Sequence, residues 1–314
     1  MSKMTQIPQN YKNMVDWVFG AYENAGVTLD NGFQKDAIQN AVGARIGKHW
    51  NDFQCDISIV TTSKGAFLVV EDSGTVGLTG ENISSETINA KMASGEKFPP
   101  TERLARFTSM NNSGGNTGPG LYGVGKSVYS VASSTYTYYF DSLRADGKYV
   151  ANVNRQGQVY SLAFEDNAAK DFIRKYTGLP PKTSTGTRII IENPKDEIVA
   201  SINSGDMVKY IQESWWLIID RLGNNSHISV GGVPVEVPAG IKEATRKYES
   251  TIEVYKPNYR VKNFGVYLSD DGSNLWSGIS YYRAGMKIGE VDLKDIPDKL
   301  SGKYWGYIEV DESW

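Results

Sequence analysis

The octapeptide GLYGVGKS, residues 120–127, constrains the fold more than any other stretch of this 314-residue chain. Its glycines and its terminal Lys126 and Ser127 match the pattern G-x-x-x-x-G-K-S, in which a flexible loop presents backbone N–H groups at the start of a helix. In one large class of folds this loop follows a buried strand of a parallel sheet, which fixes it in place. The residues before the loop therefore decide between a parallel sheet and a different architecture.

The segment before the loop has the composition of a loop, not of an apolar strand. Residues 110–119 read MNNSGGNTGP, and the whole stretch 77–120 is rich in Gly, Ser, Asn, Thr and Pro. This composition favours turns, and a loop of this length inside a compact domain is typical of a lid. A P-loop NTPase is therefore the less favoured interpretation and stays as an alternative.

Hydrophobic spacing predicts an α+β chain in two parts. Residues 32–50 predict a helix, because Phe33, Ala37 and Ala41 recur at helical spacing. The apolar segments 55–62 and 65–74 predict two strands, and strand-like segments dominate from 136 onward. An amphipathic helix is expected at 206–223, before a second strand-rich region. We expect a first domain at 1–200 and a smaller one at 201–314.

Composition excludes several classes of function. One cysteine and two histidines cannot build a disulfide framework or a Cys/His metal site, so a reducing, cytoplasmic setting is expected. A net charge of −3 gives no bulk attraction to nucleic acid. The sequence contains no run of 18 apolar residues, which predicts that it does not span a membrane.

Two acid-bearing segments indicate phosphate chemistry. Asp36 and Asn40 lie four residues apart on the predicted helix and therefore share a face. A carboxylate there can deprotonate water, and the amide oxygen can hold a magnesium ion that carries phosphates. Asp72 ends a buried strand and is followed by Gly74 and Gly77. Its carboxylate can accept a hydrogen bond from the exocyclic amine of adenine, while the glycines let the backbone pass close to the base.

The order of these segments resembles the GHKL ATPases, the superfamily of DNA gyrase, a heat-shock chaperone, histidine kinases and MutL. The resemblance covers about residues 30–195 and rests on four segments in the family's order. These are the Asp36–Asn40 helix, similar to the N box; DSGTVG and GLYGVGKS, similar to the two glycine boxes; and STGTRIII, similar to the later Gly-Thr strand.

The resemblance implies a Bergerat-type α/β sandwich, with a mixed, mostly antiparallel sheet and helices on one face. A smaller α/β transducer-like domain would follow at 201–314, and it would be a truncated one if the family's downstream effector region belongs to this protein. It also implies a magnesium-dependent ATPase whose lid, about residues 77–120, closes on ATP as two protomers dimerise. A nucleic acid or a protein is the expected client, and sequence does not choose between them.

The same resemblance implies a role for each site residue. Asp36 would be the general base and Asn40 the magnesium ligand. Adenine and phosphates would contact Asp72, Gly74, Gly77, Gly120, Tyr122, Gly123, Val124, Gly125, Lys126, Ser127 and Thr187. Lys287, or else Lys294, would reach the γ-phosphate from the second domain.

Three departures from the family pattern motivate a second hypothesis. Asp36 stands where the family usually has Glu, Gly43 stands where an acid often follows, and one extra residue separates Gly74 from Gly77. Because these changes affect water positioning more than nucleotide contact, the alternative is a nucleotide-binding interaction module with little or no hydrolysis.

Overall fold

The structure is a computed structural model and describes most of the chain. The described residues are 4–6, 20, 22, 24, 26–46, 50–108, 126–242, 246–250, 261–268, 278–291 and 304–310. Sequence also predicts a short helix at 14–26, most of which lies outside the described residues, and residues 120–125 of the glycine loop lie wholly outside them.

The described chain divides into two compact units. The first holds the described residues up to Tyr210 together with Leu222–Val235, and the second holds Ile211–Arg221 and the described residues from Glu236 onward. The sequence places the boundary near residue 200, whereas the division runs within helix α8 (Asp206–Arg221). The reason is that Trp216 and Leu217, in the second half of this helix, belong to the hydrophobic core of the second unit.

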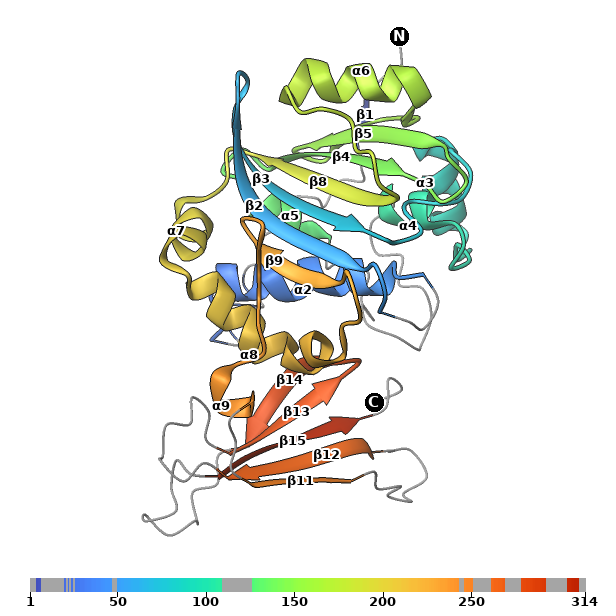
Figure 1. The fold of residues 1–314 in the computed structure, drawn as a ribbon. Helices are drawn as coiled ribbons and strands as arrows, with labels where there is room; N and C mark the ends of the chain where they lie inside the picture. The colour runs from blue at the N-terminus through green and yellow to red at the C-terminus, as the bar shows by residue number, and fades with distance from the viewer. Residues whose placement is uncertain are drawn as a thin grey trace. The chain divides into compact units, whose positions relative to one another are not determined.

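The first unit is built on one large sheet (Figure 1). Its described strands lie in the order β1-β6-β5-β4-β8-β3-β2-β9-β10, and β7 also pairs with β5. Their bounds are β1 Met4–Gln6, β2 Gln54–Thr62, β3 Gly65–Ser73, β4 Thr137–Leu143, β5 Tyr149–Arg155, β6 Gln158–Tyr160, β7 Phe164–Glu165, β8 Gly186–Glu192, β9 His227–Val230 and β10 Val233–Pro234.

The sheet is mixed and mostly antiparallel, which confirms the predicted α+β class. Among the described strands of this sheet, β2 and β9 pair in parallel and the other pairs are antiparallel. The strands predicted at 55–62 and 65–74 are β2 and β3, and their register places Asp72 opposite Cys55.

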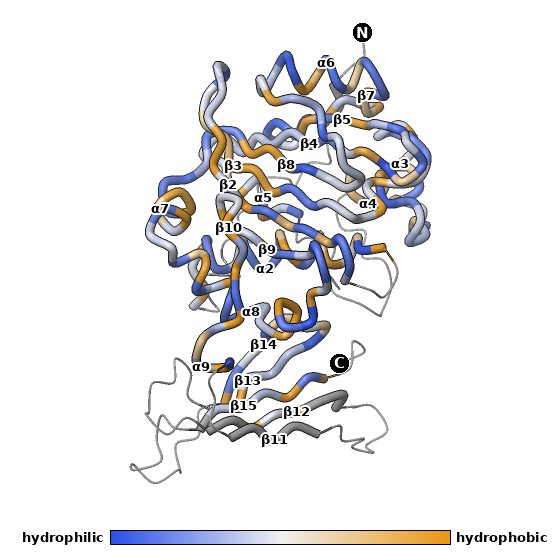
Figure 2. The backbone as a smooth tube through the Cα atoms, in the orientation of Figure 1, coloured by the Kyte–Doolittle hydropathy of each residue, from blue (hydrophilic) through white to orange (hydrophobic). Residues whose placement is uncertain are grey.

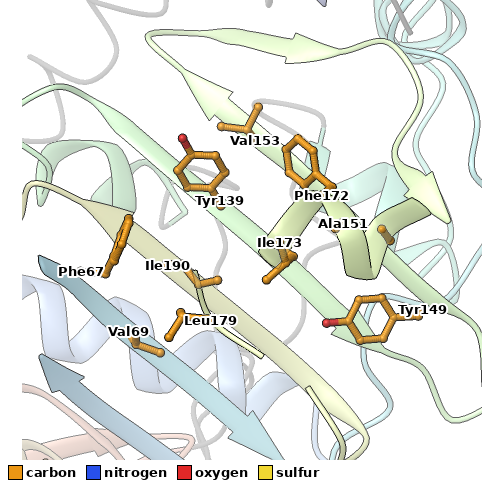
Figure 3. Close-up of a cluster of buried hydrophobic side chains, with 11 residues drawn as sticks. Phe67, Val69, Tyr139, Tyr149, Ala151, Val153, Phe172, Ile173, Leu179 and Ile190 are labelled. Atoms are coloured by element: carbon orange, nitrogen blue, oxygen red, sulfur yellow. The ribbon is translucent and has the colours of Figure 1, made fainter. Parts of the chain in front are cut away.

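One face of the sheet is covered by helix α6 (Asp166–Thr177). Figure 2 shows hydrophilic and hydrophobic residues alternating along this helix, as expected for an element with one face on a core. The cluster in Figure 3 joins the two layers. Its members are Phe67, Val69, Tyr139, Tyr149, Ala151, Val153, Ala169, Phe172, Ile173, Leu179 and Ile190.

The opposite face carries helices α2 (Leu29–Gly43) and α5 (Ser127–Val131). The Tyr129 ring lies edge-on to Tyr138, 5.8 Å between centroids. Tyr138 and Tyr139 are consecutive in a strand, so their side chains leave opposite faces. Because Tyr139 packs under α6, the expected arrangement with helices on one face is corrected: this sheet has a helix on each face (Figure 1).

Replacing the central aromatic residue of α6 should measure how firmly this layer is held. The Phe172 ring contacts Tyr139, Tyr160, Phe164 and Tyr176, with centroid distances from 4.6 to 6.1 Å. We expect Phe172→Leu to lower the free energy of unfolding by about 1–2 kcal/mol, because it keeps most of the volume but loses the ring pairs. Urea unfolding measures this.

The matched control is Asp171→Asn on the exposed side of the same helix, where the carboxylate makes only a surface ion pair. It should change the free energy of unfolding by less than about 0.5 kcal/mol. Equal effects of the two substitutions would contradict the packing role of α6.

The described part of the predicted lid is not a loop. It contains α3 (Ser85–Ala93) and α4 (Arg103–Thr108), joined by a small core of Ile88, Phe98 and Ala105. The hydroxyl of Ser84 caps α3 by accepting a hydrogen bond from Thr87 N. Turn-forming residues flank both helices and hide them from a composition-based prediction.

The second unit has a five-stranded sheet in the order β11-β12-β15-β13-β14. Its strands are β11 Arg246–Ser250, β12 Val261–Leu268, β13 Gly278–Arg283, β14 Met286–Val291 and β15 Tyr304–Val310. Helix α9 (Ala239–Lys242) belongs to this unit, and α7 (Asp196–Ser204) belongs to the first. No helix in the described part of the chain is both long and apolar enough to span a bilayer.

Candidate functional site

Helix α2 presents one polar row beside its buried face. Phe33, Ala37, Ile38 and Ala41 are buried and hold the helix in place, which confirms the predicted hydrophobic spacing. The helix runs from Leu29 to Gly43 and so begins and ends earlier than the predicted span of 32–50. Residues 32, 36 and 40, four apart, form a row along one side of this helix.

Asp36, the predicted base, receives a hydrogen bond from Tyr22. The Tyr22 hydroxyl donates to Asp36 Oδ2, and its ring packs so closely on Gly32 that an added Cβ there would lie 2.9 Å from the ring. Burial raises the pKa of the Asp36 carboxyl to about 6, while Tyr22 and the charge of Lys35 act in the lowering direction. A carboxylate with this pKa ionises near neutral pH, as a general base requires.

Asn40, the predicted magnesium ligand, is held at its amide nitrogen. Asn40 Nδ2 donates to the Tyr129 hydroxyl at 3.0 Å. The side chain otherwise faces solvent, and its Oδ1 accepts no hydrogen bond from the described residues. The amide oxygen, the atom that magnesium prefers, is therefore the accessible end of the group.

Asp72, the predicted adenine contact, accepts hydrogen bonds from the described residues at only one of its two oxygens. Oδ1 accepts from Thr187 N at 3.0 Å and from the Thr75 hydroxyl. Within the described residues no hydrogen bond reaches Oδ2. Burial raises the pKa of Asp72 to about 6, while the bonds from Thr75 and Thr187 act in the opposite direction. The residue thus offers one fixed, unused acceptor at the end of β3.

Backbone conformation and close packing require glycine at two positions after Asp72. Gly74 has φ +69°, and an added Cβ would lie 2.0 Å from the Asp52 carbonyl oxygen. Gly77 has φ +68°, and an added Cβ would lie 2.7 Å from Ser142 Oγ. Both positions therefore exclude a side chain whether or not a ligand is present.

The Tyr129 hydroxyl, from α5, meets α2 at Asn40. Burial raises its pKa most, the hydrogen bond from Asn40 lowers it, and the charges of Cys55, Asp72 and Asp36 raise it further. The backbone gives the geometry: Val76 N donates to Ala44 O at 3.0 Å, so the chain after Asp72 meets the end of α2. Asn40 contacts the Tyr129 hydroxyl, and Asp36 lies one turn away on α2, whereas the grouping of Asp72 with them in one site stays a prediction.

Basic side chains from α4 and from the start of α5 lie in the same region. Arg103 Nη2 donates to Gly43 O at 3.1 Å. Burial first and the charge of Arg106 second lower the pKa of its guanidinium, while the charge of Asp72 acts in the raising direction. Lys126 is buried, with Nζ 2.5 Å from Arg106 O; burial first and Arg106 second lower its pKa to about 7. Ser127 Oγ is buried and has no hydrogen-bond partner among the described residues.

The remaining predicted contacts are placed as follows. Thr187 is buried in β8 and supports Asp72 through its backbone N–H; its hydroxyl lies 3.4 Å from Ser142 Oγ. Gly120, Tyr122, Gly123, Val124 and Gly125 lie outside the described residues, as does Lys294. Lys287 is in the second unit, where its Nζ contacts Glu213 Oε1 at 2.5 Å and Glu290 Oε2 at 2.7 Å.

Sequence reasoning missed three residues that shape the site: Tyr22, Thr75 and Tyr129. Thr75 follows Asp72 by three residues, a spacing at which short polar side chains often bond locally, so this contact had a signal. No sequence signal indicates Tyr22 or Tyr129, because their hydroxyls meet α2 only through the tertiary fold.

The described residues contain no group of three or more His, Cys, Asp or Glu side chains that could hold a metal. Magnesium that binds with a nucleotide typically has few protein ligands together with phosphates and water, and the amide oxygen of Asn40 suits that manner of binding. No protein-family model matches the chain, and no curated protein matches it.

Proposed function

We propose that the first unit binds ATP with Mg²⁺ and hydrolyses it, as a Bergerat-type domain of the GHKL kind. One observation carries the proposal: α2 carries Asp36 and Asn40, the chain after Asp72 meets the end of the same helix through Val76 N and Ala44 O, and Asn40 Oδ1 and Asp72 Oδ2 accept no hydrogen bond from the described residues. A mostly antiparallel sheet with α2 and α5 on one face is compatible with this fold class.

At the adenine end, the geometry suits recognition of an exocyclic amine. Thr75 and Thr187 hold Asp72 Oδ1 and so fix the carboxylate plane, which leaves Oδ2 as an oriented acceptor. A buried acceptor of this kind discriminates against bases that present a carbonyl in place of the amine, because two acceptors would face each other.

At the phosphate end, three groups fit an anion. Lys126 is a buried amine next to Arg106, Ser127 Oγ is a buried hydroxyl without a partner among the described residues, and Arg103 brings a second cation. Mg²⁺ bound through Asn40 Oδ1 would offset the charge of the phosphates. In this arrangement Asp36 takes a proton from water, and Tyr22 holds the carboxylate in place while it does so.

Binding of phosphate beside Lys126 should draw a proton from solution. At pH 8 a group with a pKa of about 7 is mostly neutral, and a phosphate anion raises that pKa, so up to about one proton is taken up per ATP bound. Calorimetry in two buffers of different ionisation enthalpy measures the uptake. The Lys126→Met variant should show no proton uptake. The control is Lys97→Met, which replaces an exposed lysine of the lid and should leave the uptake unchanged. Equal binding heats in both buffers for the unmodified protein would show that no phosphate binds beside Lys126.

The alternative, a nucleotide-binding module with little hydrolysis, is favoured by one observation. The Tyr22 hydroxyl occupies one oxygen of Asp36, which leaves fewer ways for the shorter carboxylate to reach water. A P-loop NTPase has less support. β4, which follows α5, pairs antiparallel with both β5 and β8, whereas a P-loop crossover joins parallel strands.

Two assays on the unmodified chain test the proposal. Calorimetry with a non-hydrolysable ATP analogue and Mg²⁺ should show binding, and phosphate release should follow with ATP. Binding without release at any temperature would favour the interaction module, and no binding would end the proposal. The resemblance also implies that two protomers dimerise and the lid closes when ATP binds, and size-exclusion chromatography with and without the analogue tests this. The predicted contact between Lys287 and the γ-phosphate is tested by measuring phosphate release by the Lys287→Ala variant.

A further inference from the structure

Tyr129 has no role in the site as predicted from sequence, yet its hydroxyl is hydrogen-bonded to Asn40, which has one. The amide of Asn40 has two chemically different ends: Nδ2 only donates hydrogen bonds and Oδ1 only accepts them. Nδ2 donates to the Tyr129 hydroxyl at 3.0 Å. A tyrosine hydroxyl can donate or accept, and here it accepts. Because the oxygen and nitrogen diverge at the trigonal amide carbon, this bond leaves Oδ1 turned away from Tyr129.

The hydroxyl that receives this bond is itself held firmly. Tyr129 is 2% exposed, and all five residues of α5 are buried. Its ring is flanked edge-on by Phe33 of α2, at 6.5 Å and 78°, and by Tyr138 of β4, at 5.8 Å and 63°. A ring packed between the sheet and α2 offers the hydroxyl as a fixed point, whereas Asn40 is exposed and would otherwise rotate freely.

We infer that Tyr129 is a positioning residue that keeps Asn40 Oδ1, and not Nδ2, turned toward the metal-bearing phosphates. This inference rests on the proposed function, since it assumes that a magnesium nucleotide binds beside α2. The reason is electrostatic: an amide oxygen attracts a divalent cation and an amide NH₂ repels it. Without the hydroxyl, both orientations of the amide are open in the free protein, and binding has to select one.

The test compares nucleotide affinity with and without the metal. For Tyr129→Phe, calorimetry with a non-hydrolysable ATP analogue should show an unchanged affinity in EDTA. The gain in affinity on adding Mg²⁺ should fall about fivefold, the effect of one ordinary hydrogen bond. The EDTA measurement also shows that the variant is folded. Tyr139→Phe, which removes a hydroxyl bonded to Arg155 on the other face of the sheet, should leave the Mg²⁺ gain unchanged.

A second background separates positioning from packing. In the Asn40→Asp background both side-chain oxygens accept, so the group needs no orientation, and Tyr129→Phe should no longer reduce the Mg²⁺ gain. The same fivefold loss in that background, or no loss in the parent, would overturn the inference while leaving the proposed function intact. If the parent protein bound no analogue with Mg²⁺, the proposed function itself would fail.

Discussion

Asp72→Asn is expected to lower the affinity for ATP by at least about 100-fold, or about 2.7 kcal/mol. In the substituted protein, the side-chain oxygen at position 72 can still accept the hydrogen bond from Thr187 N. The NH₂ group then takes the place of Oδ2 and faces the adenine amine. Two donors would face each other in a buried site, and both would lose a hydrogen bond. Calorimetry with the Mg²⁺ analogue measures the loss.

The adjacent residue provides the matched control. Glu71 leaves the opposite face of the same strand, where it contacts Lys182 Nζ at 2.7 Å. Glu71→Gln removes the same charge one residue away and should keep ATP affinity within about threefold. An Asp72→Asn protein that melts normally and binds ATP like the parent would show that Asp72 does not recognise the base.

Asp36→Ala should abolish turnover and preserve binding. Loss of a general base costs about 10²–10⁴-fold in rate, whereas the base makes no required contact with the bound nucleotide. We expect phosphate release to fall by about 10³-fold and analogue affinity to stay within a few-fold. The control variant Asp30→Asn, changed at the start of the same helix, should hydrolyse ATP at the parent rate. If the Asp36→Ala variant also hydrolysed ATP at the parent rate, another group would be the base.

The pH dependence follows from the raised pKa values. Asp36 acts as a base only when ionised, so kcat should be present above about pH 6 and decline as pH falls through that value. Asp72 also has a pKa of about 6, and its protonation weakens binding and not turnover. The two effects are separated because affinity reports Asp72 and kcat at saturating ATP reports Asp36.

The part of the fold predicted from sequence is the part with strong local periodicity. Strands β2 and β3, and helices α2 and α8, carry continuous apolar spacing and were predicted near their observed places. Helix α6 was missed, although its core face is clear, because the surrounding sequence is strand-rich and the interval is short. Its position across the sheet from α2 depends on tertiary packing, which local pattern does not encode.

Prediction of the site is limited in the same way, because local pattern does not encode tertiary contacts. Asp36 and Asn40 could be grouped from their spacing, and Asp72 from its place at the end of a strand. The contacts that orient them could not, since Tyr22 and Tyr129 reach α2 from positions 14 and 89 residues away from their partners. The helices of the predicted lid were missed because glycine and proline around α3 and α4 outweigh the few apolar residues of their core.

A crystal structure with a non-hydrolysable ATP analogue and Mg²⁺ would be the most direct measurement. We expect the adenine amine within hydrogen-bond distance of Asp72 Oδ2, the metal on Asn40 Oδ1, and a water between Asp36 and the γ-phosphate. A nucleotide held by the 120–127 loop alone, with its base away from Asp72, would contradict this arrangement.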